Sequence, residues 1–146
     1  MFRLAVLSCA LFAVAFGCSC QERTDDIARK LYCRSDLVGE FVVTGVAVSD
    51  DSFNVHYNAV STNIYKNFDK TFFDDASSKQ EITIIVSTRR DSSACGRKLT
   101  VGSKYFMNGP FNKDSKTLSV ATCSGISRDE FQNLIVKEKY QCPASQ

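Results

Sequence analysis

In this 146-residue sequence, the cysteines are the residues whose spacing most clearly indicates a chemical role. Two of them, Cys18 and Cys20, form a Cys-x-Cys pair directly after an apolar stretch. Such a pair has two chemical uses, because cysteine sulfur either ligates a metal as a thiolate or forms a disulfide. The other cysteines are spread along the chain at Cys9, Cys33, Cys95, Cys123 and Cys142.

Residues 1–17 have the form of a secretory signal peptide. A basic residue, Arg3, is followed by an apolar run that ends at Phe16, and the small residue Gly17 precedes the expected cleavage point. The run is shorter than the roughly 20 apolar residues of a transmembrane helix, and no later segment reaches that length. We therefore expect a secreted, extracellular protein with no membrane span, whose mature chain is residues 18–146.

Cleavage at this point removes Cys9 and leaves an even set of six cysteines. An even set in a small secreted chain indicates three disulfides, so bridges are favoured over a metal site at Cys18 and Cys20. Six cysteines allow fifteen pairings, and the spacing alone selects none of them. The mature chain begins with the free α-amino group of Cys18. That terminus is either the start of a disulfide framework or the working end of the molecule.

Charge and the remaining reactive residues narrow the function classes. The formal net charge of +2 indicates neither a nucleic-acid partner nor a membrane surface. The single histidine, His56, alternates out of phase with the apolar face of a strand, so we predict a surface or cross-strand role and no enzyme activity. Acidic pairs in helix-start or turn contexts are expected to cap locally and not to bind calcium. These pairs are Asp25–Asp26, Asp50–Asp51 and Asp74–Asp75.

The elements that position these residues are mainly strands. Thr24 is a predicted N-cap for a short helix over residues 24–32. Val-rich and alternating patterns predict strands, with bulges where glycine interrupts at Gly39 and Gly45. The predicted strands are residues 37–48, 53–65, 81–88, 104–107 and 117–122.

Connections and a second helix complete the pattern. Residues 66–80 are predicted to be a long connection, residues 89–98 a loop, and residues 108–110 a turn. Ser127 and Glu130 form a capping box, so a second helix is predicted from there to about residue 138. The chain shows no internal repeat, and we expect one domain.

The motifs around the cysteines, taken in order, resemble those of a known family. They are Cys18-Ser19-Cys20, Tyr32-Cys33-Arg34-Ser35-Asp36-Leu37-Val38, Ser93-Ala94-Cys95-Gly96, Ala121-Thr122-Cys123 and Tyr140-Gln141-Cys142. Together they resemble the inhibitory N-terminal domain of the tissue inhibitors of metalloproteinases, a netrin-like module. The resemblance spans nearly all of residues 18–142 and covers only this domain, as in short invertebrate members.

The resemblance implies a fold and a disulfide pairing. The fold is mainly β, a five-stranded OB-fold-like closed barrel with a short N-terminal helix, a C-terminal helix and three disulfides. The implied bridges are Cys18–Cys95, Cys20–Cys123 and Cys33–Cys142. In this arrangement the first two bridges attach the mature N-terminus to the barrel.

The resemblance also implies a function. Family members are secreted inhibitors of zinc metalloproteinases of the matrix or disintegrin type, and we expect a monomer with no cofactor of its own. The α-amino nitrogen and carbonyl oxygen of the first cysteine, here Cys18, chelate the catalytic zinc of the protease at the position that it keeps open for water. The other residues implied to contact the protease are Ser19, in the pocket beside the zinc, Cys20 and Gln21 along the cleft, and Ser93 and Ala94 on a second ridge.

One departure from the family pattern bears on the range of proteases, and a second hypothesis stands beside inhibition. Gln21-Glu22-Arg23-Thr24 stands where Pro-rich sequence is expected, so charged Glu22 and Arg23 are predicted at the edge of the protease interface. The alternative function is a non-inhibitory netrin-like module that binds an extracellular-matrix or immune-related partner. The cleavage point separates the two hypotheses, because any residue left ahead of Cys18 removes the chelating amine.

Overall fold

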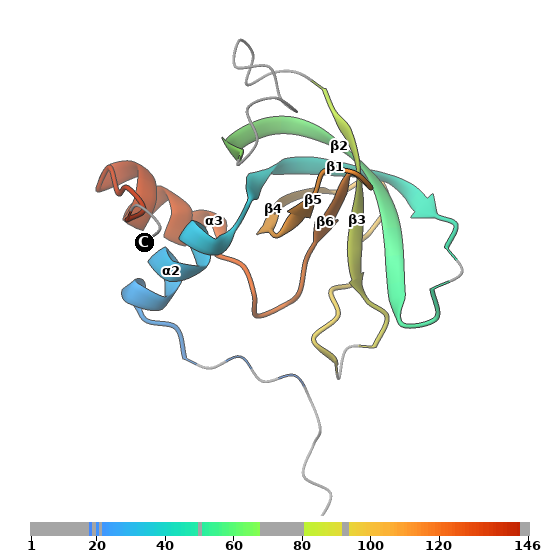
Figure 1. The fold of residues 1–146 in the computed structure, drawn as a ribbon, viewed down its shortest axis with the longest axis horizontal. Helices are drawn as coiled ribbons and strands as arrows, with labels where there is room; N and C mark the ends of the chain where they lie inside the picture. Colours follow the sequence, from blue (N-terminus) through green and yellow to red (C-terminus); the bar gives the residue numbers. More distant parts are fainter. Residues whose placement is uncertain are drawn as a thin grey trace, which may run out of the picture.

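The sheet of this protein curls into a half-barrel of six strands (Figure 1). The computed structural model describes residues 18, 20, 22–49, 51–67, 81–91 and 94–143, and the account below concerns these residues. The strands lie in the order β4-β1-β2-β3-β6-β5. Their bounds are β1 Leu37–Ala47, β2 Asn54–Asn67, β3 Thr83–Arg89, β4 Lys104–Gly109, β5 Phe111–Asn112 and β6 Thr117–Ser119.

Strand β1 lies between β4, at one edge of the sheet, and β2, and it pairs antiparallel with both. The register between β1 and β2 shifts beside Gly39 and Gly45, which confirms the irregularities predicted at these glycines. A Cβ atom at Gly39 would lie 2.6 Å from the carbonyl oxygen of Asn63 on β2, so this close approach requires glycine. The irregularities let the long pair of strands coil.

The predicted turn at residues 108–110 is wrong. Asn108 and Gly109 continue β4 and pair with Val38 and Leu37 of β1. Pro110, which has no N–H to donate, interrupts the run before β5, and this interruption gives six strands where five were predicted. The chain then turns and returns as β6, which pairs antiparallel with β5 and parallel with β3.

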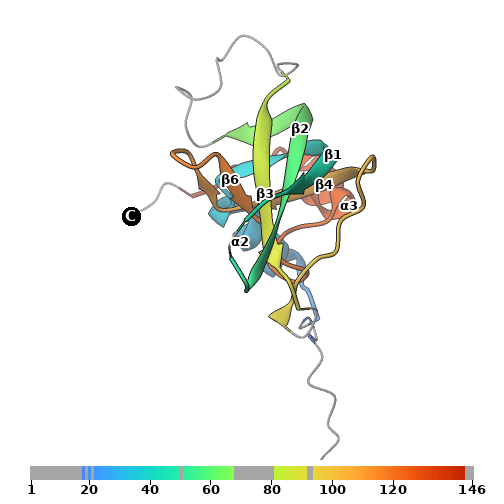
Figure 2. The same ribbon diagram turned by 90° about the vertical axis from the view of Figure 1, so that its right-hand side faces the viewer.

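Two helical segments lie together at one end of the sheet (Figures 1 and 2). Helix α2, Asp25–Arg34, begins as predicted at Thr24, whose hydroxyl accepts a hydrogen bond from the N–H of Ile27. The predicted capping box begins α3, Arg128–Glu130, which continues as the π-helical segment η2, Phe131–Lys137. Helix α2 packs against η2.

Two apolar cores meet across β1. Successive strand residues point to opposite faces, so Leu37 faces the interior of the half-barrel and Val38 faces the helices. The interior core includes Leu37, Phe41, Ile84, Val86, Met107 and Leu118. The second core consists of Ala28, Val38, Ile126, Phe131, Leu134 and Ile135.

The mainly β fold, the short N-terminal helix, the C-terminal helix and the three disulfides are confirmed. The predicted leader, residues 1–17, and residues 68–80 of the predicted connection lie outside the described residues. Within the described part of the chain, no helix is both long and apolar enough to cross a membrane.

Candidate functional site

The candidate site is built around the first two of three disulfides. The bridges join Cys18 to Cys95, Cys20 to Cys123 and Cys33 to Cys142, with Cα–Cα distances of 5.0, 5.3 and 5.5 Å. These are the pairs that the family resemblance implies. Bridges of this kind are typical of proteins that fold in an oxidising compartment.

The first two bridges lie side by side. Sγ of Cys18 is 3.4 Å from Sγ of Cys123, although each atom belongs to a different disulfide. The sulfurs of Cys18, Cys95 and Cys123 all lie within 4.8 Å of one another. Because every one of these sulfurs is bonded to another sulfur, the cluster offers no thiolate to a metal ion. What remains at Cys18 for ligation is its backbone.

The two loops that receive these bridges are also joined by hydrogen bonds. The N–H of Thr122 donates to the carbonyl of Cys95 at 3.0 Å, and the Thr122 hydroxyl donates to the carbonyl of Gly96 at 3.1 Å. Cys95 has a φ of 62°, a left-handed conformation that costs a non-glycine residue roughly 1–2 kcal/mol. The carbonyl of Asp91 accepts from the N–H groups of Ala94 and Gly96 and holds this turn.

The structure brings three of the predicted contact residues to one side of the molecule. The N-terminal segment passes beneath the sheet, where the loops that follow β3 and β6 also descend (Figures 1 and 2). Cys18 is half-buried, whereas Cys20 and Ala94 are exposed. Ser19, Gln21 and Ser93 lie outside the described residues. We call the segment from Cys18 to Cys20, together with the bridged loop residues Ala94 to Gly96 and Ala121 to Cys123, the N-terminal ridge.

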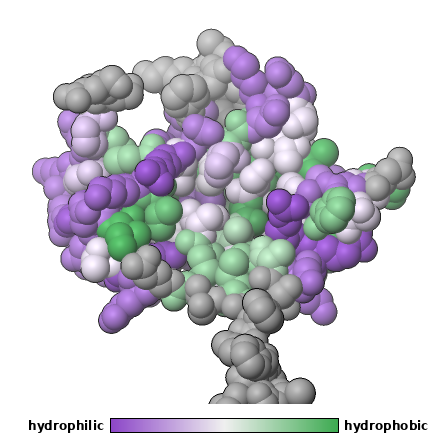
Figure 3. Space-filling model, turned by 60° about the horizontal axis from the view of Figure 1, so that its bottom comes forward, coloured by the Kyte–Doolittle hydropathy of each residue, from purple (hydrophilic) through white to green (hydrophobic). Residues whose placement is uncertain are grey.

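The side of the molecule that carries these loops has a mildly hydrophobic centre between hydrophilic flanks (Figure 3). A cleft of about 510 Å³ adjoins the ridge, since Thr122 belongs to both. Its cationic lining residues are Arg23, Arg97, Lys104 and Arg128.

Buried Glu40 on β1 balances part of this positive charge. Its carboxylate oxygens lie 2.8 Å from Nζ of Lys104 and 2.9 Å from Nη2 of Arg128, and one accepts a hydrogen bond from Asn63. The hydrogen bond from Lys104 is the largest influence and lowers the pKa of Glu40, although burial opposes it. The side chain of Glu40 is only 3% exposed, so its charge depends on these partners.

Arg23 lies in the segment that follows Cys20 and makes two intramolecular contacts, with its guanidinium directed toward α3 and the loop after β6. Its predicted position at the edge of a protease interface stays a prediction. Nη1 donates to Oε2 of Glu130 at 2.9 Å, and Nη2 donates to the carbonyl of Cys123 at 3.4 Å. No local pattern indicates this contact, because 107 residues separate Arg23 from Glu130.

The other residues considered from the sequence have local roles. His56 is partly buried on β2, with Nε2 3.7 Å from Oδ2 of Asp51. Asp51 accepts hydrogen bonds from the N–H groups of Phe53 and Asn54, which confirms local capping there. Asp25 and Asp26 lie in the first turn of α2, as predicted. Residues 50, 74 and 75 lie outside the described residues.

Comparisons of the chain with protein-family models and with curated proteins find no match.

Proposed function

We propose that this protein is a secreted inhibitor of zinc metalloproteinases of the matrix or disintegrin type, acting through Cys18 as its mature N-terminal residue. The observation that carries the proposal is the adjacent pair of bridges at Cys18 and Cys20. They fix both cysteines of the Cys-x-Cys pair to two loops that are themselves joined by hydrogen bonds. A terminus held in this way presents backbone atoms and not thiols.

The proposal includes a closed five-stranded barrel of the OB type. Its support is the pairing pattern, in which β4 pairs with β1 while β5, only one residue further along the chain, pairs with β6. If β4 and β5 are counted as one strand, that strand joins the two edges of the curled sheet. The parallel pairing of β3 with β6 completes a five-stranded circuit.

The proposed mechanism uses the terminal amine and the carbonyl oxygen of Cys18 as two ligands of the protease's zinc. A catalytic zinc keeps one position open for water or substrate, and the pair of ligands displaces the occupant. The amine must be neutral to donate, and an α-amino pKa of about 7.7–8.0 makes its deprotonation inexpensive near neutral pH. Because the bridges hold the terminus before binding, little conformational entropy is lost on association.

The remaining contacts follow the family resemblance. Ser19 is proposed to enter the specificity pocket beside the zinc, and Cys20 and Gln21 to lie along the cleft. Ser93 and Ala94, next to the Cys18–Cys95 bridge, form the second contact ridge. The protein itself contributes no metal and no catalytic group in this mechanism.

The decisive experiment compares two N-termini. One protein begins at Cys18, and the other carries one additional alanine ahead of it, which converts the amine into an amide. Both are assayed against a panel of matrix and disintegrin-type metalloproteinases. We expect strong inhibition by the first protein and little by the second. Equal inhibition by both, or none by either, contradicts the chelation mechanism.

One observation favours a second candidate, a non-inhibitory netrin-like module with an extracellular-matrix or immune-related partner. Val46, Val48 and Phe53 flank the connection between β1 and β2 and are 61%, 102% and 72% exposed. Large exposed apolar patches mark interaction sites, and these three exposed side chains are candidates for one. Partner binding that survives the alanine extension but is lost on replacing Val48 and Phe53 by serine would support this candidate over protease inhibition.

A further inference from the structure

We infer that Arg23 is a positioning residue, which orients the N-terminal ridge by linking the chain after Cys20 to Glu130 and to the carbonyl of Cys123. The restraint is a property of the fold. Its effect on inhibition rests on the proposed function.

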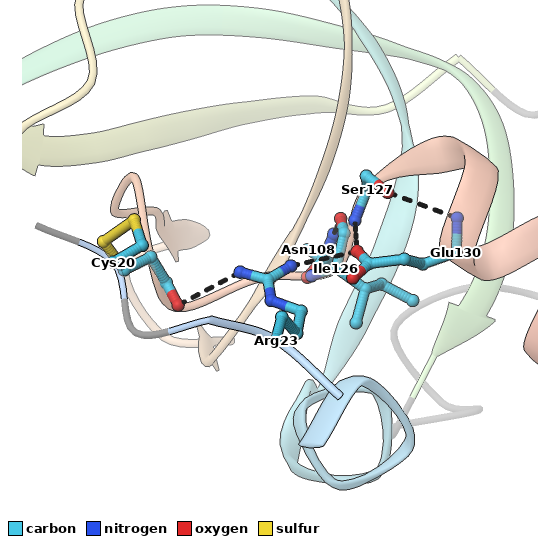
Figure 4. Close-up of polar contacts among 7 residues, drawn as sticks. Cys20, Arg23, Asn108, Ile126, Ser127 and Glu130 are labelled. Atoms are coloured by element: carbon cyan, nitrogen blue, oxygen red, sulfur yellow. Dashed lines mark hydrogen bonds and ion pairs between the residues drawn. A yellow bond between two sulfur atoms is a disulfide. The ribbon is translucent and has the colours of Figure 1, made fainter. Parts of the chain in front are cut away.

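The contacts of Arg23 reach two separate parts of the protein. Its guanidinium donates to the carboxylate of Glu130 on α3 at 2.9 Å and to the backbone of Cys123 at 3.4 Å (Figure 4). Cys123 is the disulfide partner of Cys20, so one side chain connects the ridge, the bridged loop and the C-terminal helix. The side chains of Arg23 and Glu130 are 22% and 26% exposed, which shields the ion pair from part of the solvent.

Glu130 is itself held in place. The oxygen that accepts from Arg23 also accepts from the N–H of Ser127 at 2.7 Å, as part of the capping box. The residue before Ser127, Ile126, is fixed by two hydrogen bonds of 2.8 Å to the buried side chain of Asn108 on β4. A continuous series of contacts therefore runs from Arg23 to the sheet (Figure 4).

The bridges hold Cys18 and Cys20 against the two loops, and Arg23 adds a restraint on the chain that follows Cys20. A disulfide restrains the two cysteines that it joins, but it does not restrain the residues that follow them in the chain. Residues 22–24 belong to neither a helix nor a strand, so no backbone ladder orients them. Ligands that must meet a zinc ion need placement within about 0.5 Å, which a supporting contact provides.

The test compares Arg23→Gln with Glu130→Gln and with a matched control. Glutamine at position 130 keeps an acceptor for the capping box but removes the charge. The control is Arg29→Gln, which breaks the ion pair of Arg29 with Glu138, 2.5 Å apart, between α2 and the C-terminal side of η2. The Arg29 side chain is 25% exposed, close to the value for Arg23.

Three readouts are measured on protein that begins at Cys18: the inhibition constant, the melting temperature, and the ¹⁵N relaxation of the backbone amides of Cys20 and Glu22. We expect Arg23→Gln and Glu130→Gln each to weaken inhibition about tenfold, which corresponds to roughly 1.4 kcal/mol. The double variant should inhibit no less strongly than the more impaired of the two single variants, because each change removes the same Arg23–Glu130 ion pair. Arg23→Lys, which keeps the charge but not both hydrogen bonds, should recover part of the inhibition.

A purely structural role gives a different pattern. In that case Arg23→Gln and Arg29→Gln would lower the melting temperature and alter inhibition alike, and the inference would be overturned. Additive losses of inhibition in the double variant would overturn it as well, since they would mean that the two residues act separately.

Failure of the proposed function is recognised separately. If the wild-type protein inhibits no protease, the relaxation data still decide the positioning role. We expect the amides of Cys20 and Glu22 to become more mobile in Arg23→Gln and to remain unchanged in Arg29→Gln. Unchanged amide order in Arg23→Gln would overturn the inference, whether or not the protein inhibits.

Discussion

The side-chain amide of Asn108 on β4 forms two hydrogen bonds with the backbone of Ile126, one from its Nδ2 to the carbonyl and one to its Oδ1 from the N–H, both 2.8 Å long. Both residues are buried, at 5% exposed each. The pair joins the sheet to the chain that leads into α3, and it satisfies a donor and an acceptor that water cannot reach.

Replacing Asn108 by leucine should destabilise the protein by about 2–4 kcal/mol, because two buried backbone groups of Ile126 lose their partners. Urea denaturation measures this change in the free energy of unfolding. Asn112→Ala is the control, since the Asn112 side chain accepts hydrogen bonds only in an exposed turn. An equal effect of the two variants would show that the Asn108–Ile126 pair has no special importance.

Gly125 should not tolerate a side chain. A Cβ atom at this position would lie 2.5 Å from Oδ1 of Asn108, so either the loop or the amide must move. We expect Gly125→Ala to cost about 1–3 kcal/mol, as overpacking does in cores. Thermal melts of Gly125→Ala and of a control, Gly45→Ala, measure this cost. At Gly45 a Cβ atom would meet nothing closer than Nδ2 of Asn58 at 3.9 Å, so Gly45→Ala should be neutral or stabilising. A neutral Gly125→Ala would contradict the prediction.

Glu40 should make the stability depend on pH in the acid range. Its folded-state pKa is held below its ordinary value of 4.5, chiefly by the hydrogen bond from Lys104, so it stabilises the fold above pH 4.5. This stabilisation is lost as the pH falls through the lowered folded-state pKa. Glu40→Gln should therefore cost about 1–3 kcal/mol near neutral pH and progressively less toward acid pH.

Urea unfolding curves of wild type and Glu40→Gln over this pH range check the prediction. Asp26→Asn serves as the control, because Asp26 forms an exposed pair with Lys30 and its loss should change stability little. If the free energies of unfolding of wild type and Glu40→Gln differ by the same amount at all pH values, the charge of Glu40 does not contribute to stability.

The Cys33–Cys142 bridge should stabilise the fold without serving the ridge. It joins residues 109 positions apart, for which the chain-entropy model gives roughly 4–5 kcal/mol. We expect Cys33→Ser/Cys142→Ser to lose most of that stability in urea denaturation, while protein that remains folded keeps its inhibition constant. Inhibition that falls in the folded variant would show that this bridge also orients the N-terminus.

Local signals account for the parts of the fold that the sequence predicts. Thr24 and Ser127 begin helices because their hydroxyls accept backbone hydrogen bonds within three residues, so the pattern is complete in a short window. The glycine irregularities in β1 are likewise local. The turn predicted at residues 108–110 failed because strand pairing with β1 and the contact with Ile126 outweigh the turn preference of Asn-Gly-Pro.

The candidate site combines residues that no window contains. The Cys-x-Cys pair draws attention to the N-terminus, but it does not reveal which loops receive the bridges. The position of Arg23 depends on a carboxylate 107 residues away, and the cationic cleft depends on the packing of β4 against the loop after β6. Such contacts are formed by the tertiary fold, and no periodic pattern in the sequence predicts them.

The separations of the bridged cysteines also determine the order in which the protein can mature. Every bridge spans at least 77 residues, so none can close until Cys95 has been synthesised. At about 5–20 residues per second, Cys18 waits roughly 4–15 s for its partner. During this time Cys18, Cys20 and Cys33 are one another's nearest thiols and can pair wrongly. Wrong pairs of this kind are corrected by disulfide exchange, so we expect a disulfide isomerase to raise the yield of native protein.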